Sequence, residues 1–132
     1  MTSSIELALE AKRFAVTGVS RYPTKFGHRI YRFLVKAGLD VYAVNPNADC
    51  IEDAPCYPSL CDLPIVPDCV VIVTQPWVTT GTVKEAIRLG IKNIWMQPGA
   101  DSRDGVAAAQ EADVNLVFGG PCIMVELNRE DN

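Results

Sequence analysis

The stretch from Arg13 to Gly38, RFAVTGVSRYPTKFGHRIYRFLVKAG, constrains the fold of this chain more than any other. It begins with an apolar, partly β-branched run, Phe14 to Val16, which is typical of a buried parallel strand. A loop that contains glycine and proline follows, from Thr17 to Phe26. From Gly27 onward apolar residues recur at helical spacing, and Gly38 is suited to end that helix. A strand that leads into a helix through such a loop presents free backbone N–H groups to an anion.

The charges of the chain are unevenly distributed. The whole sequence has 12 Lys and Arg against 16 Asp and Glu, which gives a formal net charge of -4. No acidic residue occurs between Ala11 and Leu39, and all the residues of the predicted loop and helix lie in this basic window. Arg32 and Lys36 fit a solvated helix face. Arg21 and Lys25 fall in the loop, where a site for a polyanionic small ligand is as good an interpretation as a solvated surface.

Length and composition exclude several classes of protein. We expect 132 residues, 48% of them hydrophobic, to form one globular domain over residues 1–132. No apolar run reaches the ~20 residues of a membrane span, and the N-terminus does not have the order of a signal peptide. Five cysteines without a CxxC motif, together with one histidine, argue against a disulfide framework and a zinc site. We therefore expect a cytoplasmic protein, and the acidic balance argues against nucleic-acid binding.

The rest of the chain alternates between strand and helix patterns. A short helix over Ser3–Ala11 has Ser3 and Glu6 spaced as a capping box. The segment from Asn45 to Pro67 carries five prolines, so we expect it to be irregular with at most one helical turn, near residues 59–63. The residues from Cys122 to Leu127 read as a short apolar tail. Further strands are predicted at 40–44, 68–74, 92–96 and 114–118, with helices from Gln75 to Gly90 and from about Ser102 to Ala112.

This alternation predicts an α/β fold, a three-layer Rossmann-like doubly wound parallel sheet of about five strands in the order 3-2-1-4-5. Ligands of such sheets bind outside the carboxyl ends of the strands. Small, polar or proline residues stand at every one of these ends: Gly18–Ser20, Asn45–Pro46, Thr74–Pro76, Met96–Pro98 and Gly119–Gly120.

A dinucleotide such as NAD fits this sequence less well than a ligand with more phosphate. The NAD fingerprint needs G-x-G-x-x-G and an acidic residue at the end of the second strand. Here Gly18 is followed by eight other residues before Gly27, and the second strand ends in Asn45-Pro46. The longer loop suits a more heavily phosphorylated ligand.

Four short pieces of the chain resemble the coenzyme-A-binding domain proteins. They are GVSRYPTKFGHRI in the first loop, VNPN after the second strand, CYPSLCDLP in the proline-rich segment and WMQPG after the fourth strand. The resemblance extends from about Arg13 to Glu126. It implies a Rossmann-like domain, similar to the coenzyme-binding domain of the succinyl-CoA synthetase α subunit, that binds coenzyme A or an acyl-CoA.

The resemblance and the strand ends together predict the ligand contacts. Lys25 and the N–H groups of Ser20 and Gly27 would hold the phosphates, and the adenosine half would lie between residues 44–46 and 73–75. The pantetheine would pass Met96 and Gln97, while Trp95 points to the opposite face of the sheet. The complete set is Gly18, Val19, Ser20, Arg21, Lys25, Phe26, Gly27, His28, Asn45, Pro46, Val73, Thr74, Gln75, Pro76, Met96 and Gln97.

Catalysis by the chain itself is not expected. His28 with Cys122 is a conceivable base and nucleophile, but a polar residue at the start of a helix is the better interpretation of His28. Two other functions stay open: an NAD-binding redox or regulatory domain, and a subunit that completes an acyl-CoA synthetase in trans. No protein partner can be named from the sequence.

Overall fold

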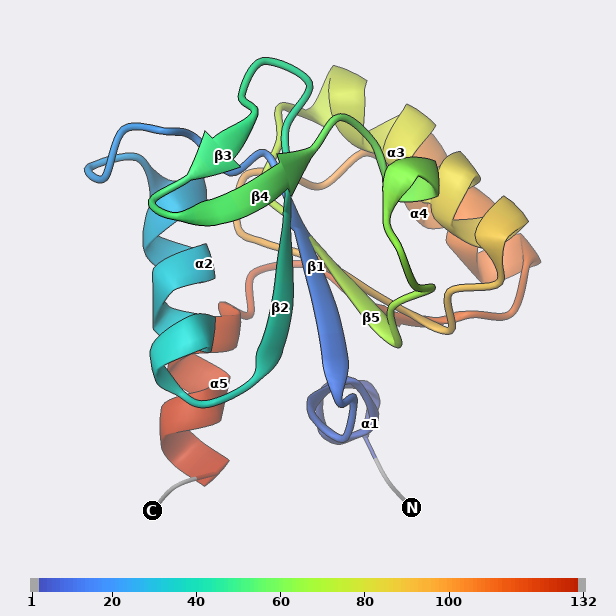
Figure 1. Cartoon of the computed structure of the whole chain (residues 1–132). Helices are drawn as coiled ribbons and strands as arrows, with labels where there is room; N and C mark the ends of the chain where they lie inside the picture. The colour runs from blue at the N-terminus through green and yellow to red at the C-terminus, as the bar shows by residue number, and fades with distance from the viewer. Residues whose placement is uncertain (1–2, 131–132) are drawn as a thin grey trace.

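The computed structural model describes residues 3–130, which form five α-helices, one short 3-10 helix and seven strands (Figure 1). In chain order these are α1 (Ser4–Leu9), β1 (Arg13–Thr17), α2 (Phe26–Lys36), β2 (Asp40–Val44), β3 (Cys50–Ile51), β4 (Ala54–Tyr57), the 3-10 helix η1 (Leu60–Asp62), β5 (Cys69–Ile72), α3 (Pro76–Leu89), β6 (Asn93–Met96), α4 (Arg103–Glu111), β7 (Asn115–Val117) and α5 (Ile123–Glu130).

The strands form one sheet in the order β3-β4-β2-β1-β5-β6-β7, and every pair is parallel except β3 with β4. Helices α2 and α5 lie on one side of the sheet and α3 and α4 on the other, as Figure 1 shows. The predicted α/β Rossmann-like fold is confirmed.

The predicted strand order is wrong for the strand at residues 68–74. This strand, β5, pairs with β1 from Phe14 and Cys69 to Thr17 and Ile72, instead of lying beyond β2. The position beyond β2 is taken by β4, which belongs to the segment that we expected to be irregular. Pro55 does not prevent this pairing, because β4 contacts β2 only through its next two residues. The single helical turn expected in this segment is η1.

The predicted apolar tail is also wrong, since residues 123–130 form helix α5. Ile123 is fully buried, and Met124 and Leu127 pack against the same core, so the apolar residues share one helix face. Trp95, in β6, and Gln97, just after that strand, hold the start of this helix. The indole N–H of Trp95 donates to the carbonyl of Pro121 at 3.0 Å, and the backbone N–H of Ile123 donates to Oε1 of Gln97 at 2.9 Å.

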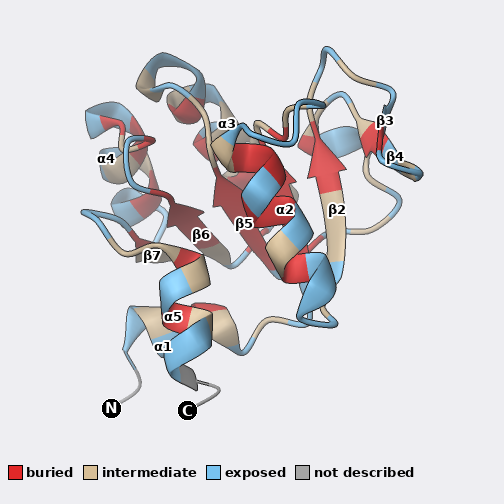
Figure 2. Ribbon diagram, turned by 90° about the vertical axis from the view of Figure 1, so that its left-hand side faces the viewer, coloured by how far each residue is buried: buried red, intermediate tan, exposed pale blue. Residues whose placement is uncertain are grey.

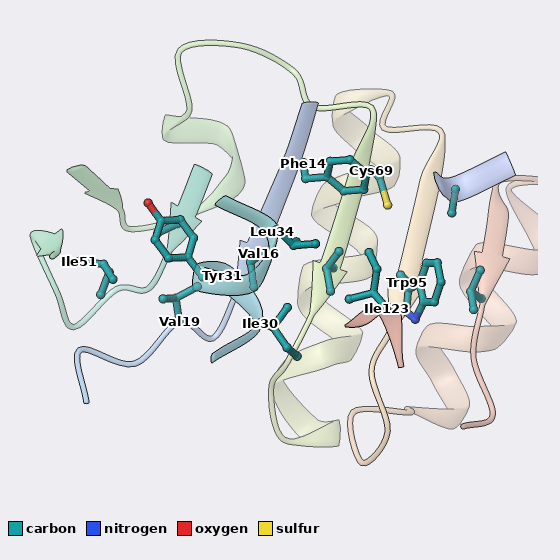
Figure 3. Packing of buried hydrophobic residues seen from close by; sticks show 14 of the residues in the cluster. Phe14, Val16, Val19, Ile30, Tyr31, Leu34, Ile51, Cys69, Trp95 and Ile123 are labelled. Atoms are coloured by element: carbon teal, nitrogen blue, oxygen red, sulfur yellow. The ribbon is translucent and has the colours of Figure 1, made fainter. Parts of the chain in front are cut away.

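Alternate residues of the central strands supply two separate cores, one on each face of the sheet, and the buried residues concentrate there in Figure 2. Phe14 and Trp95 belong to the core under α1, α2 and α5, where Figure 3 shows them with Ile30, Leu34 and Ile123. Met96 belongs to the core under α3 and α4. Trp95 and Met96 therefore point to opposite faces, as the sequence predicts. The other tryptophan, Trp77, lies in the first turn of α3 and is 77% exposed.

Candidate functional site

The carboxyl edge of the sheet carries two adjoining hollows that share Gly18, Ser20, Thr74 and Val78. The loop cleft, of about 670 Å³, is lined by Gly18, Ser20, Lys25, Phe26, Gly27, Val73, Thr74, Gln75, Val78, Pro98, Gly99 and Ala100. The proline pocket, of about 360 Å³, is lined by Thr17, Gly18, Ser20, Val44, Asn45, Pro46, Asn47, Pro58, Ser59, Leu60, Thr74, Val78, Thr82 and Glu85.

Two glycines bring the first loop, helix α2 and strand β5 into direct backbone contact. A Cβ atom on Gly18, whose φ is +80°, would stand 2.1 Å from the carbonyl oxygen of Val73. A Cβ atom on Gly27 would stand 2.2 Å from the carbonyl oxygen of Gly18. Neither position has room for a side chain, and this close packing places the first turn of α2 at the wall of the loop cleft.

The two helices that begin at the loop cleft have no side-chain cap, whereas two helices elsewhere do. Lys25 and Gln75 occupy the N-cap positions of α2 and α3, and neither side chain bonds the helix backbone. In contrast, the hydroxyl of Ser3 accepts from the N–H of Glu6 at 3.1 Å, and that of Ser102 accepts from Gly105 at 3.0 Å. The loop cleft therefore faces two positive helix ends that can donate hydrogen bonds to an anion.

Lys25 is the basic side chain that lines the loop cleft, and it makes no ion pair with any residue in the range 3–130. Other basic residues of the window are engaged with neighbours. Arg13 lies 3.7 Å from a carboxylate oxygen of Asp40, and Arg32 lies 3.6 Å from one of Glu52. Lys25 thus adds an uncompensated positive charge to the two helix ends.

His28 supports the first loop from beneath instead of lining either hollow. Its side chain is 2% exposed, and its Nδ1 lies 2.6 Å from the carbonyl oxygen of Ser20. A carbonyl oxygen only accepts, so Nδ1 carries the hydrogen. The other ring nitrogen faces Glu52 Oε1 at 3.4 Å. Cys122 takes part in a different contact, since its sulfur accepts from Gln97 Nε2 at 3.2 Å.

Asn45, which follows β2 and lines the proline pocket, forms hydrogen bonds through both polar atoms of its side-chain amide. Its Nδ2 donates to the carbonyl of Val19 at 2.7 Å, and its Oδ1 accepts from the N–H of Asn47 at 2.8 Å. The amide therefore ties the turn after β2 to the loop after β1. A carboxylate that could hold a ribose diol is not present at this strand end.

The two buried cysteines, Cys56 and Cys69, do not have activated thiols. Burial raises the pKa of the Cys56 thiol, which donates to the carbonyl of Asn45 with the sulfur 3.8 Å away. Burial also raises the pKa of the Cys69 thiol, at the start of β5, and that of the Tyr31 hydroxyl on α2. These groups stay protonated at neutral pH, so neither thiol is activated.

All five cysteines are unpaired thiols. Within residues 3–130, no group of three or more His, Cys, Asp or Glu side chains is arranged to hold a metal ion. None of the helices in this part of the chain is both long and apolar enough to cross a membrane.

The structure brings ten of the sixteen predicted contact residues to the two hollows. These ten are Gly18, Ser20, Lys25, Phe26, Gly27, Asn45, Pro46, Val73, Thr74 and Gln75. The other six, which line neither hollow, are Val19, Arg21, His28, Pro76, Met96 and Gln97.

Met96 and Gln97 are fully buried, so neither side chain offers surface to a ligand in this structure. Met96 fills the core under α3 and α4, and Gln97 bonds the start of α5. The residues that follow them, Pro98, Gly99 and Ala100, line the loop cleft in their place. The strand alternation that separates Trp95 from Met96 also directs Met96 into a core, because helices cover both faces of this sheet.

Sequence reasoning missed the part that α3 and the proline-rich segment play in the proline pocket. Val78, Thr82 and Glu85 line it from one face of α3. Their spacing of four and three residues is a helical-face signal, but the apolar face formed by Val83 and Ala86 is the stronger pattern. Three consecutive residues of the proline-rich segment, Pro58 to Leu60, also line the pocket.

Two curated relatives of the chain are acetate–CoA ligases. The chain is 34% identical over 101 residues to acetate–CoA ligase [ADP-forming] II of Archaeoglobus fulgidus, covering 75% of this chain and 15% of the ligase. It is 31% identical over 129 residues to acetate–CoA ligase [ADP-forming] I of the same organism, covering 90% of this chain and 18% of that ligase. The chain thus spans less than a fifth of either enzyme.

Solved structures of two small proteins and of one larger enzyme share both fold and sequence with this chain. A conserved hypothetical protein from Pyrococcus furiosus has 41% identity and a TM-score of 0.82, with 87% of this chain and 98% of that chain covered. A hypothetical protein from Pyrococcus horikoshii OT3 has 30% identity and a TM-score of 0.91, with 98% and 90% covered. The acetyl-coenzyme A synthetase 1 of Ca. Korarchaeum cryptofilum, solved with phosphate and ADP, has 27% identity and a TM-score of 0.72, with 83% and 25% covered.

The family model described as CoA binding domain matches residues 12–128. This match covers nearly the whole chain and agrees with the resemblance of its loop and strand-end motifs. The protein belongs to the CoA binding domain family.

Proposed function

We propose that this protein binds coenzyme A or an acyl-CoA at the carboxyl edge of its sheet, without catalysing a reaction by itself. The observation that carries the proposal is the convergence of Lys25 with the uncapped N-termini of α2 and α3 on one cleft. Helix ends and a free ammonium group bind phosphate through charge-assisted hydrogen bonds. The match to the CoA binding domain family supports coenzyme A as the phosphate-bearing ligand.

The two hollows fit the two chemical halves of coenzyme A. The diphosphate would lie in the loop cleft, held by Lys25 and by the N–H groups of Ser20 and Gly27. The adenosine half would enter the proline pocket, where Pro46 and Pro58 offer apolar walls. The pantetheine would leave along Pro98 to Ala100, at the far end of the loop cleft. The two hollows adjoin, so one elongated ligand can occupy both.

Coenzyme A suits the site better than NAD. The end of β2 provides Asn45, whose amide is already bonded to Val19 and Asn47, where an NAD site has a carboxylate. The absence of catalysis rests on His28, which is buried with Nδ1 engaged by the Ser20 carbonyl. We also propose a cytoplasmic setting, because all five cysteines are unpaired thiols.

Calorimetric titration with coenzyme A, acetyl-CoA, NAD and ATP tests the proposal. We expect saturable binding of the first two ligands and weaker binding of NAD. The Lys25→Ala variant should lose about 1.5–3 kcal/mol of binding free energy, the value of a charge-assisted hydrogen bond. Lys36→Ala removes the same charge from the other end of α2 and should bind like the wild type. Equal affinity of Lys25→Ala and wild type would place the phosphates elsewhere.

A second candidate function is that of a coenzyme-A-binding component of an acyl-CoA ligase, favoured by the acetate–CoA ligases among the relatives. Since this chain matches only 15–18% of those ligases, other chains would supply the remaining steps. Acetyl-CoA formation from acetate, ATP and coenzyme A should then be undetectable with this chain alone. Adding the chain to an Archaeoglobus ligase from which the matching region has been removed should restore product formation.

A further inference from the structure

Glu85 is the charged side chain in the lining of the proline pocket, and the proposed function does not use it. It lies on α3, partly buried, and its Oε1 accepts from the backbone N–H of Leu60 at 3.2 Å. That bond joins α3 to the first turn of η1 and fixes the carboxyl group at the pocket wall. A carboxylate has a second oxygen, which remains able to accept a hydrogen bond from a ligand.

We infer that Glu85 reads the exocyclic amino group of an adenine ring, so that the proline pocket selects a 6-aminopurine. The inference rests on the proposed binding of a coenzyme A nucleotide half in this pocket. Beyond the proposed function, the inference names the base that the site selects and the residue, Glu85, that determines this selection.

The distribution of charge along the two hollows orients the ligand. Lys25 and the helix N-termini make the loop cleft the favourable place for phosphate. Glu85 makes the proline pocket unfavourable for phosphate, because two negative groups would lie close together in a partly dry site. The group that enters the proline pocket is therefore not an anion, and a hydrogen-bond donor is the partner that suits the carboxylate.

The remaining walls fit a flat, apolar ring. Pro46 and Pro58 have rigid rings, and Val44, Leu60 and Val78 provide further apolar surface. A purine base presents two apolar faces with hydrogen-bonding groups only on its edges. Adenine complements this pocket, because its faces can pack against the apolar walls while its amino group donates a hydrogen bond to the carboxylate of Glu85.

Thr17 supplies a second, independent indication of a ligand in this pocket. It lines the pocket and is 4% exposed, and its hydroxyl oxygen has no hydrogen-bond partner among the described residues. A buried hydroxyl without a partner costs folding free energy. Rotation of the Thr17 side chain toward a ligand would break no hydrogen bond of the protein. The hydroxyl group could then donate a hydrogen bond to a nitrogen of the base.

A pocket with one hydrogen-bond acceptor, Glu85, and one donor, Thr17, can distinguish adenine from hypoxanthine. Adenine has an amino donor at C6 beside an acceptor nitrogen at N1, whereas hypoxanthine has a carbonyl acceptor beside an N–H donor. Glu85 and Thr17 match the first pattern. The carboxylate would repel the carbonyl of hypoxanthine, and a site built to bond a polar group rejects the analogue that lacks it.

The test compares the dissociation constants of adenosine 3′,5′-bisphosphate and inosine 3′,5′-bisphosphate, which differ only in the base. Wild-type protein should prefer the adenosine compound by roughly tenfold or more, as for a hydrogen bond to a charged group. Glu85→Gln keeps an oxygen for the N–H of Leu60 and offers an amide donor, so the preference should fall to within about threefold. Glu10→Gln, at the opposite edge of the sheet, removes the same charge and should keep the wild-type preference.

A second variant, Thr17→Val, removes the unpartnered hydroxyl without breaking a hydrogen bond, so it should fold at least as stably as wild type. It should bind the adenosine compound more weakly. If the wild type binds both compounds equally while still binding coenzyme A, the inference is overturned and the proposed function stands. If Glu85→Gln weakens both compounds equally, the carboxylate binds the ribose and the base assignment is rejected. Failure of coenzyme A itself to bind would reject the proposed function.

Discussion

The Cα atom of Gly27 packs against the carbonyl oxygen of Gly18 so closely that a methyl group there would stand 2.2 Å from that oxygen. Gly18 in turn packs against the carbonyl of Val73. The ends of β1 and β5 and the start of α2 are therefore one close-packed unit. The geometry of the loop cleft depends on this unit, because all three of these residues line it.

The first prediction concerns Gly27→Ala. The added methyl group must push α2 away from the first loop, because the atom that it meets is backbone oxygen. We expect a loss of about 1–3 kcal/mol in the free energy of unfolding, and weaker binding of coenzyme A. Urea denaturation measures the stability, and calorimetry measures the binding.

Gly81→Ala is the matched control. A Cβ atom on Gly81 would meet nothing within 4 Å, and alanine favours a helix, so this variant should gain up to about 1 kcal/mol in the free energy of unfolding. A Gly27→Ala variant as stable as wild type would contradict the packing.

The second prediction concerns the support that His28 gives to the first loop. In His28→Gln the side-chain amide no longer lies where Nδ1 meets the Ser20 carbonyl, whereas the amide nitrogen of His28→Asn occupies about that place. His28→Gln should therefore be less stable than His28→Asn by about 1 kcal/mol. Coenzyme A affinity should follow the same ranking, because Ser20 lines both hollows. Equal stability and affinity of the two variants would mean that the Nδ1 bond does not hold the loop.

The third prediction concerns the pH dependence of stability. Burial raises the pKa of Cys69 in the folded state, so above pH about 8.5 the unfolded chain loses this proton while the folded chain keeps it. The folded state then binds more protons, and the free energy of unfolding falls as pH rises, by up to about 1.4 kcal/mol per pH unit. Below that pH the contribution of this thiol is fully present.

Urea denaturation at several pH values between 7.5 and 10 measures this slope. Cys69→Ala should be less stable at neutral pH, because it leaves a cavity in a fully buried position, but it should show a shallower slope. Cys61→Ala changes an exposed thiol and should keep the wild-type slope. Parallel slopes for wild type and Cys69→Ala would show that this thiol does not titrate differently on unfolding.

The fourth prediction separates the structural use of Gln97 from a ligand contact. Gln97→Met keeps the volume but leaves the N–H of Ile123 without its acceptor. We expect a loss of about 1–3 kcal/mol in stability, with faster amide hydrogen exchange in α5. The dissociation constant for coenzyme A should stay within about threefold of wild type, because Gln97 does not line the loop cleft. Gln110→Met, on the exposed face of α4, is the control and should alter neither property. A large loss of affinity with intact stability would instead restore Gln97 as a ligand contact.

Local signals in the sequence predict most of the architecture. The period of the apolar residues locates β1, α2, β5 and α3, and the capping residues locate the starts of α1 and α4. The ends of the strands then indicate one edge of the sheet as the site. Ten of the predicted contact residues do line the hollows there.

The parts that the sequence did not predict depend on contacts between distant segments. Strand β4 is short and contains Pro55, and it forms because β2 offers a free edge. Helix α5 needs the acceptor of Gln97, a residue 26 positions away along the chain. The burial of Met96 follows from the packing of α3 and α4 over the sheet, which no local pattern specifies. Glu85 was missed because a single carboxylate on an amphipathic helix looks like any solvated residue.

The positions of the two tryptophans give the molecule two separate optical reporters. Trp95 is fully buried between the sheet and the helices, and its indole N–H is bonded to the Pro121 carbonyl. Trp77 is 77% exposed and lies in the chain between Gln75 and Val78, both of which line the loop cleft. Blue-shifted emission from Trp95 will therefore follow the integrity of the sheet, whereas red-shifted, iodide-quenchable emission from Trp77 will follow events at the cleft. Unfolding and ligand binding can therefore be followed at different emission wavelengths in one unlabelled sample.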